Sequence, residues 1–290
     1  MLRKLKSRMV MIRPEKMVPQ EPELAKRIWA DIYTAAESAA EQEPKLTGLL
    51  DDVILSRNKL ATAVSVRLAR KLSRRDIGRD DLEPLIRSLL KSDPLVVEMM
   101  AADLQAVVDR DAACHNALEP LMFFKGFHAL ATYRLAHILW KQERYMLALL
   151  FQSVGSEVFG IDIHPAARIG CGVLLDHGTG FVVGETAIIE NDVSLFHEVT
   201  LGGTGKEKGG NRHPIVRSGV LIGAGAKVLG RVEVGECAKV AASSVVLSDV
   251  RPHTTVGLRL SALQGRAKLK SFLRHLENYP SGEGAPLLRE

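Results

Sequence analysis

The second half of the sequence carries an aliphatic residue at every sixth position. With a two-residue slip and one longer break, this row is Ile163, Ile169, Leu175, Val183, Ile189, Leu195, Leu201, Val216, Ile222, Val228, Val234, Val240 and Val246. A second row, four residues further on, is small or β-branched: Ala167, Val173, Thr179, Ala187, Val193, Val199, Val220, Ala226, Val232, Ala238, Ser244 and Val250. The one exception follows Leu201, where the break begins. A period of six fits neither a helix nor a simple strand and indicates a solenoid.

This period suits a triangular prism in which each flat face takes six residues. The aliphatic residue points into the narrow interior, its neighbour four positions on must be small, and glycine permits the tight corners. With three hexapeptides per coil, residues 163–250 make about four and a half coils. A Val/Gly-rich sandwich would instead need alternation within strands and turn signals every ~8–12 residues. The two rows in register therefore favour a parallel β-helix.

Residues 20–155 show helical spacing instead. Apolar residues recur at helical intervals between Glu21 and Ala40 and in segments 49–72, 82–90, 95–108 and 125–150. Prolines at positions 44, 84, 94 and 120 punctuate these segments. We therefore predict an α+β chain with an N-terminal α-helical domain followed by the β-helix. The expected parts are a basic disordered leader over residues 1–19, a helical domain over 20–159, a β-helix domain over 160–257 and a C-terminal tail over 258–290.

The net charge of +5 comes from the start of the chain, where residues 1–16 carry six basic side chains against Glu15. This leader has no aromatic residue, and a second basic stretch at residues 266–274 has only Phe272. Neither interleaves basic and aromatic residues as a single-strand binder would, so nucleic acid binding is not expected. Three widely spaced cysteines indicate neither a zinc site nor a disulfide framework. No apolar run reaches the ~18 residues of a membrane span or forms a signal-peptide core. We expect a cytoplasmic protein without a membrane partner.

Polar residues that could do chemistry cluster at two places in the repeat. Asp176-His177 directly follows the inward-facing Leu175, so His177 should face outward at a corner. Asp162 lies fifteen residues earlier, and coils rise about 4.8 Å, so we expect it to approach His177 from the neighbouring coil. A carboxylate on one imidazole nitrogen would make His177 a general base for a hydroxyl. The alternative is that Asp162 only ends its segment and His177 is a surface residue.

The second place is the break in the repeat. Residues 204–215 form a polar, glycine-rich segment, predicted to be a loop thrown out from the solenoid. Loops on a rigid scaffold often carry function. Adjacent Arg212 and His213 are groups that can bind an anion and transfer protons, which argues against a simple surface excursion.

Together these motifs resemble the bacterial serine acetyltransferase family. The matching segments are 162–170, 175–180, 183–187, 199–205, 212–214 and 222–227. The segment 121–139, which contains residues 125–130, resembles the last part of the family's helical domain. The resemblance covers roughly residues 25–257. It implies a left-handed β-helix that transfers acetyl from acetyl-CoA to the hydroxyl of L-serine. The product, O-acetyl-L-serine, forms in the first step of cysteine biosynthesis, without a covalent acetyl-enzyme.

The resemblance also implies roles for individual residues. His177 matches the general base, Asp162 its carboxylate partner, and His213 belongs to the same catalytic set. Asp111 and Asp176 match residues that hold the substrate at its ammonium group. Arg212 and His213 match residues that hold its carboxylate, and Glu185 matches a nearby acid. The positions that match the CoA site are Gly203, Thr204, Ala224, Lys239 and Ala242. No metal is expected.

The family's partners follow in the same way. We expect a dimer of trimers assembled through the helical half, with sites in the grooves between neighbouring prisms, and feedback inhibition by L-cysteine. Members that dock O-acetylserine sulfhydrylase commonly end in isoleucine, whereas this sequence ends Leu288-Arg289-Glu290, which argues against that docking. Residues 254–261 lack the family's usual proline and residues 240–245 lack its glycines, so the CoA end of the groove departs from the pattern.

Two other activities on the same solenoid remain alternatives. Another hexapeptide acyltransferase, with a sugar or antibiotic as acceptor, is the nearest rival, and the long helical half argues against it. A γ-type carbonic anhydrase would need zinc held by His177, His197 and His213, and would leave the Gly-Gly-Thr-Gly segment unexplained. A non-catalytic scaffold would not need the intact set of His177, Asp162, Arg212 and His213.

Overall fold

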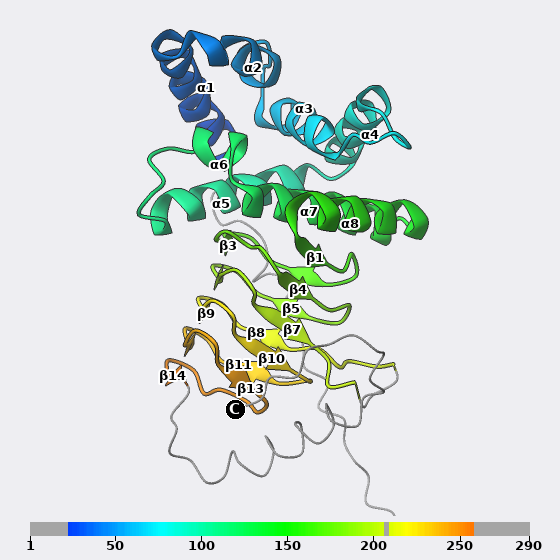
Figure 1. Ribbon diagram of the computed structural model, residues 1–290, viewed down its shortest axis with the longest axis vertical. Coiled ribbons are helices and arrows are strands. Elements are labelled where there is room, and N and C mark those ends of the chain that lie inside the picture. Colours follow the sequence, from blue (N-terminus) through cyan, green and yellow to red (C-terminus); the bar gives the residue numbers. More distant parts are fainter. Residues whose placement is uncertain (1–22, 206–208, 258–290) are drawn as a thin grey trace, which may run out of the picture. The chain divides into compact units, whose positions relative to one another are not determined.

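The computed structural model describes residues 23–205 and 209–257 (Figure 1). The expectations for the leader (1–19), the tail (258–290) and the chain's last three residues lie outside the described residues. The first half is helical: α1 (Leu24–Gln42), η2 (Pro44–Leu46), α2 (Thr47–Leu50), η3 (Asp51–Leu55), α3 (Leu60–Leu72), α4 (Arg79–Ser92), α5 (Pro94–Arg110), α6 (Leu118–Met122), α7 (Lys125–Lys141) and α8 (Tyr145–Phe159). No described helix is long and apolar enough to cross a membrane.

Some helix boundaries differ from the predicted segments. The segment 125–150 is broken at Gln142–Arg144, where Glu143 takes a left-handed backbone conformation with φ 59°. No glycine or proline marks that break in the sequence. Pro84 lies inside α4 instead of ending a helix, whereas Pro94 occupies the first turn of α5, where a missing N–H costs nothing. Helix α8 ends at Gly160, which adopts the left-handed conformation typical of a helix C-terminus.

The second half is a parallel β-helix, as predicted. Its strands are β1 (Ile161–Ile163), β2 (Arg168–Ile169), β3 (Leu174–Leu175), β4 (Phe181–Val183), β5 (Ile188–Ile189), β6 (Ser194–Leu195), β7 (Thr200–Gly202), β8 (Ile215–Val216), β9 (Leu221–Ile222), β10 (Lys227–Leu229), β11 (Glu233–Val234), β12 (Lys239–Val240), β13 (Val245–Val246) and β14 (Thr255–Val256). The described strands form three parallel sheets in the orders β1-β4-β7-β10-β13, β11-β8-β5-β2 and β14-β12-β9-β6-β3. Successive strands thus pass from one face of the prism to the next.

The aliphatic row explains this arrangement. Each of its thirteen residues lies in one of the strands β1–β13, and all are buried, because only inward-facing positions fill the narrow interior. The second row is wrong at Thr179, which is exposed. The two-residue slip puts Phe181, 1% exposed, in the interior position instead. The solenoid also extends past the predicted row, since β14 pairs with β12.

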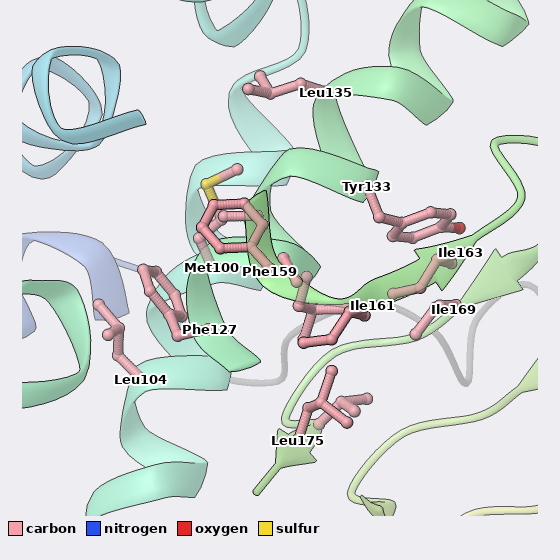
Figure 2. Close-up of a cluster of buried hydrophobic side chains, with 14 of the residues drawn as sticks. Met100, Leu104, Phe127, Tyr133, Leu135, Phe159, Ile161, Ile163, Ile169 and Leu175 are labelled. Atoms are coloured by element: carbon pink, nitrogen blue, oxygen red, sulfur yellow. The ribbon is translucent and has the colours of Figure 1, made fainter. Parts of the chain in front are cut away.

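Helix α7 packs closely against the first coil. A side chain at Gly126 would come within 1.9 Å of the Leu175 carbonyl oxygen, so only glycine permits this approach. Further along α7, the Tyr133 hydroxyl donates to the Ala167 carbonyl at 2.6 Å, and His137 Nδ1 lies 2.7 Å from the Pro165 carbonyl. Figure 2 shows residues of the helices and of the first coil in one continuous buried cluster.

A buried ion pair fixes the same junction. Arg134 of α7 and Asp103 of α5 have side chains only 2% and 1% exposed, and their two parallel hydrogen bonds are 2.8 and 2.9 Å long. Asp103 also accepts the N–H of Val173 at 3.0 Å, and Arg134 donates to the Gly170 carbonyl at 2.7 Å. The pair therefore ties two helices to the turn that precedes β3.

Candidate active site

The residue pair Asp176-His177 lies at the end of β3, in the wall of a cavity of about 350 Å³. Asp111, at the C-terminus of α5, lines the same cavity, as do Phe124 and Lys125 at the start of α7. The cavity exists because α5 and α7 both pack against β3. The structure thus brings together three of the predicted residues, Asp111, Asp176 and His177, from the helical half and the first coil.

His177 stands at a corner of the prism, as its position after Leu175 predicts. Its backbone is left-handed with φ 55°, its side chain is 73% exposed, and its Nε2 lies 3.7 Å from Asp176 Oδ1. Lys125 donates a hydrogen bond to the Thr179 hydroxyl just beyond this corner. An exposed imidazole beside a carboxylate can take a proton from a bound hydroxyl.

The neighbouring coils repeat this corner in register. Leu175, Leu195, Ile222 and Val240 pair along one sheet, so the residues two positions after them form a column: His177, His197, Ala224 and Ala242. The rings of His177 and His197 meet edge to face, 5.8 Å between centroids. Predicted CoA residues Ala224 and Ala242 therefore follow His177 along the same corner, and exposed Lys239 lies in β12 beside them. The sequence did not predict that His197 contacts His177 or that Lys125 lines the cavity. The contact between the histidines could have been predicted from the strand register, in which Leu175 pairs with Leu195.

A second group of predicted residues lies at a different corner, after β4. Arg212 and Glu185 form an ion pair of 2.8 Å, and both are partly exposed. His213 is 7% exposed and packs against Gly184, where an added side chain would come within 2.1 Å of the ring. Burial, and next to it the charge of Arg212, lower the pKa of His213 below its ordinary value. A guanidinium beside a neutral imidazole N–H is a suitable receptor for a carboxylate.

The remaining predicted CoA residues belong to this second corner. Gly203 and Thr204 follow β7, one coil beyond Glu185. A Cβ atom added at Gly203 would lie 3.7 Å from His213 Nε2. The predicted CoA residues are therefore divided between the two corners of one chain.

The predicted approach of Asp162 to His177 from a neighbouring coil is wrong for one chain. Asp162 lies in β1, on a different sheet from β3, and the residue paired with it in the next coil is Val182. Within residues 23–205 and 209–257, no hydrogen bond or ion pair joins Asp162 to His177; Asp162 accepts from Gln152 at 2.7 Å instead. Fifteen residues span less than one coil, so the two residues stand on different faces of the same coil.

The zinc-dependent alternative requires three protein ligands close together. In the part of the chain that the structure describes, no group of three His, Cys, Asp or Glu residues could hold a metal ion. His177 and His197 share one corner, whereas His213 lies at the other.

Comparison with known proteins gives a consistent result. A family model described as "Serine acetyltransferase, N-terminal" matches residues 28–132. The chain is 49% identical to the serine acetyltransferase of Escherichia coli strain K12 over 228 residues, covering 79% of this chain and 83% of that protein. Among solved structures, the Brucella abortus serine acetyltransferase in complex with coenzyme A is 47% identical with a TM-score of 0.79, covering 81% of this chain and 94% of that one.

Two further structures were solved with small molecules. The soybean serine acetyltransferase complexed with serine is 46% identical with a TM-score of 0.80, covering 83% of this chain and 99% of that one. A serine acetyltransferase in complex with cysteine is also 46% identical, with a TM-score of 0.79, and covers 82% of this chain and 98% of that one.

Proposed function

The chain belongs to the serine acetyltransferase family, and we propose that it transfers the acetyl group of acetyl-CoA to the hydroxyl of L-serine. The single observation that carries this proposal is the cavity that Asp111, Asp176 and His177 line together. It offers two carboxylates for an ammonium group and an exposed imidazole for a hydroxyl, which is the set that a small amino alcohol requires. A sugar or an antibiotic has no need of the carboxylate receptor formed by Arg212 and His213.

The reaction follows from these groups. His177 removes the proton of the serine hydroxyl while the oxygen attacks the thioester carbonyl carbon, and the C–S bond of acetyl-CoA breaks as the new C–O bond forms. The CoA thiolate leaves and takes up a proton, which the imidazolium can supply. Both reactants are held in one complex, so proximity supplies much of the rate. No nucleophilic cysteine is required.

Substrate orientation rests on both corners. Asp111 and Asp176 hold the ammonium group of serine, and Arg212 and His213 hold its carboxylate, with Glu185 orienting the Arg212 guanidinium through their 2.8 Å ion pair. For acetyl-CoA, Gly203 and Thr204 act from one corner and Ala224, Lys239 and Ala242 from the other. The acetyl group then lies between the two corners.

Because these two corners stand on different edges of one prism, we propose that each site forms between two copies of the chain. One copy contributes His177, and its neighbour contributes Arg212, His213 and Asp162, which then supports His177 across the interface. This division supports a trimer of β-helices, and helical domains over residues 20–159 join two such trimers into a hexamer. The relative solved in complex with cysteine supports competition by L-cysteine for the serine site, as expected of a cytoplasmic enzyme of cysteine biosynthesis.

The test is the initial rate of thiol release from acetyl-CoA with L-serine, compared with L-threonine, L-homoserine and a panel of sugars. We expect L-serine to give the highest kcat/KM. His177→Ala should lose most of kcat with its fold intact, whereas the matched control His115→Ala, at an exposed histidine of the helical half, should keep wild-type turnover. A sugar preferred over L-serine, or full turnover by His177→Ala, would overturn the proposal.

A further inference from the structure

The Thr186 side chain binds the segment in which the 204–215 loop rejoins the solenoid. Thr186 follows Glu185 at the second corner, and its hydroxyl oxygen accepts the backbone N–H of Arg212 at 3.0 Å and that of His213 at 3.1 Å. The same hydroxyl lies 2.8 Å from His213 Nδ1, and the Thr186 backbone N–H donates to that Nδ1 at 3.1 Å. Two parts of one residue therefore converge on one ring nitrogen.

From this geometry we propose that Thr186 is a positioning residue, which fixes His213 as the neutral tautomer with its proton on Nε2 and thereby aims a donor at the carboxylate of the substrate. The hydroxyl oxygen already accepts two N–H groups, so its own hydrogen is free to point at Nδ1. A nitrogen that receives two donors cannot itself carry a proton. The proton of the neutral ring must then sit on Nε2.

The surroundings of the ring agree with this assignment. The Nε2 edge packs against Gly184, where an added side chain would come within 2.1 Å of Nε2, and one at Gly203 would lie 3.7 Å from it, so glycine at position 184 leaves the space that a side chain would fill. The Arg231 guanidinium donates to the carbonyls of Thr186 and His213 at 3.1 and 2.9 Å, which holds both backbones in place. A rigid frame of this kind keeps the ring in one orientation.

Burial and positively charged neighbours favour the neutral ring. Burial is the largest cause that lowers the pKa of His213, and the charges of Arg212 and Arg231 add to it, against the opposing effect of Glu185. His164 also faces the ring, and burial lowers its own pKa. Protonation would also place a second N–H against the two donors of Thr186. The receptor thus presents the Arg212 guanidinium, which already pairs with Glu185, and one neutral donor to the substrate carboxylate.

The direct test is the ¹⁵N NMR spectrum of protein whose histidines carry ¹⁵N in the ring. The chain has nine histidines, and the His213 signals are identified as those that His213→Gln lacks. We expect a protonated Nε2 and an unprotonated Nδ1 in the free wild-type protein at neutral pH. Thr186→Val keeps the shape and the backbone N–H that donates to Nδ1 but loses the hydroxyl, so the Nδ1 signal should move part of the way toward its protonated position, and Thr186→Ser should restore the wild-type pattern. A wild-type His213 protonated on Nδ1, or a Thr186→Val spectrum identical to that of the wild type, would overturn the proposal.

Kinetics give the second readout, and only this part rests on the proposed function. Thr186→Val should raise KM for L-serine by roughly threefold to tenfold, the effect of one weakened hydrogen bond, and leave KM for acetyl-CoA within about twofold. Thr186→Ser should stay near wild type. Equal increases in both KM values would indicate a general structural defect and overturn the positioning role. If L-serine were not a substrate at all, the NMR pattern would still decide the tautomer, so the two failures are distinguishable.

Discussion

Replacing Asp103 with asparagine should destabilise the protein more than any surface substitution. The change leaves one Arg134 N–H without an acceptor, because an amide nitrogen can only donate. It keeps the volume of the side chain, and its amide oxygen can still accept the N–H of Val173, so no cavity contributes. It removes the negative charge that faces Arg134, whose side chain is 2% exposed and donates to Asp103 at 2.8 and 2.9 Å. The loss is that of one buried charge left unpaired.

The magnitude follows from that burial. Breaking a buried pair by removing one partner costs about 3–5 kcal/mol, against a total free energy of unfolding of about 5–15 kcal/mol for a typical domain. Removing the other charge as well should recover part of this loss. In Asp103→Asn/Arg134→Met the buried charge is gone, and its cost is replaced by that of the Gly170 carbonyl, which has lost its donor, about 1–3 kcal/mol. The amide N–H groups at position 103 lack an acceptor in both variants, so they do not affect the comparison.

The assay is urea unfolding followed by circular dichroism, at one protein concentration for all variants, with the free energy of unfolding extrapolated to zero urea. Asp192→Asn is the matched control, because that carboxylate is 72% exposed and lies 4.0 Å from Arg110, so it should change stability by less than about 1 kcal/mol. A double variant as unstable as Asp103→Asn, or less stable, would refute the reasoning that the unpaired charge causes the loss.

Three further predictions concern pH, packing and assembly. Burial lowers the pKa of His128 to about 3, so the folded protein keeps this ring neutral while the unfolded chain binds a proton below pH ~6.5. Stability is therefore lost as pH falls from about 6.5 toward 3, and His128→Gln should reduce the slope of unfolding free energy against pH in that window by up to about 1.4 kcal/mol per unit; an unchanged slope would contradict this. Gly184→Ala places a methyl group 2.1 Å from the His213 ring, so KM for L-serine should rise at least about fivefold while the circular dichroism spectrum stays unchanged, and an unchanged KM would show that the ring is not needed where it lies. Inactive His177→Ala and Arg212→Ala chains, refolded together, should regain part of the activity if each site takes one corner from each copy. A mixture that stays inactive would indicate that both corners of a site belong to the same copy.

The β-helix could be predicted because its interior leaves few choices. A narrow prism accepts one aliphatic residue per face and only a small residue beside it, so sequence and structure share one period. The predicted row of small residues was wrong at Thr179, because the two-residue slip before Val183 places Phe181 in the interior position instead. The helix break at Gln142–Arg144 carried no glycine or proline, so nothing local marked it.

The site was predictable in its parts and not in its arrangement. The position of His177 after Leu175 predicts that it faces outward, and its side chain is 73% exposed. The partnership with Asp162 was inferred from a coil's rise, which says nothing of the face on which each residue stands. Lys125 was missed because it joins the cavity only through the packing of α7 on the first coil, a tertiary contact without a local signal.

The most direct test of the proposed reaction is the identity of its product. The protein is incubated with L-serine and acetyl-CoA labelled with ¹³C in the acetyl group, and the label is followed by NMR while free thiol is measured in the same sample. We predict O-acetyl-L-serine in an amount equal to the CoA released. Release of CoA with the label in free acetate alone, or no release in the presence of L-serine, would contradict the assignment.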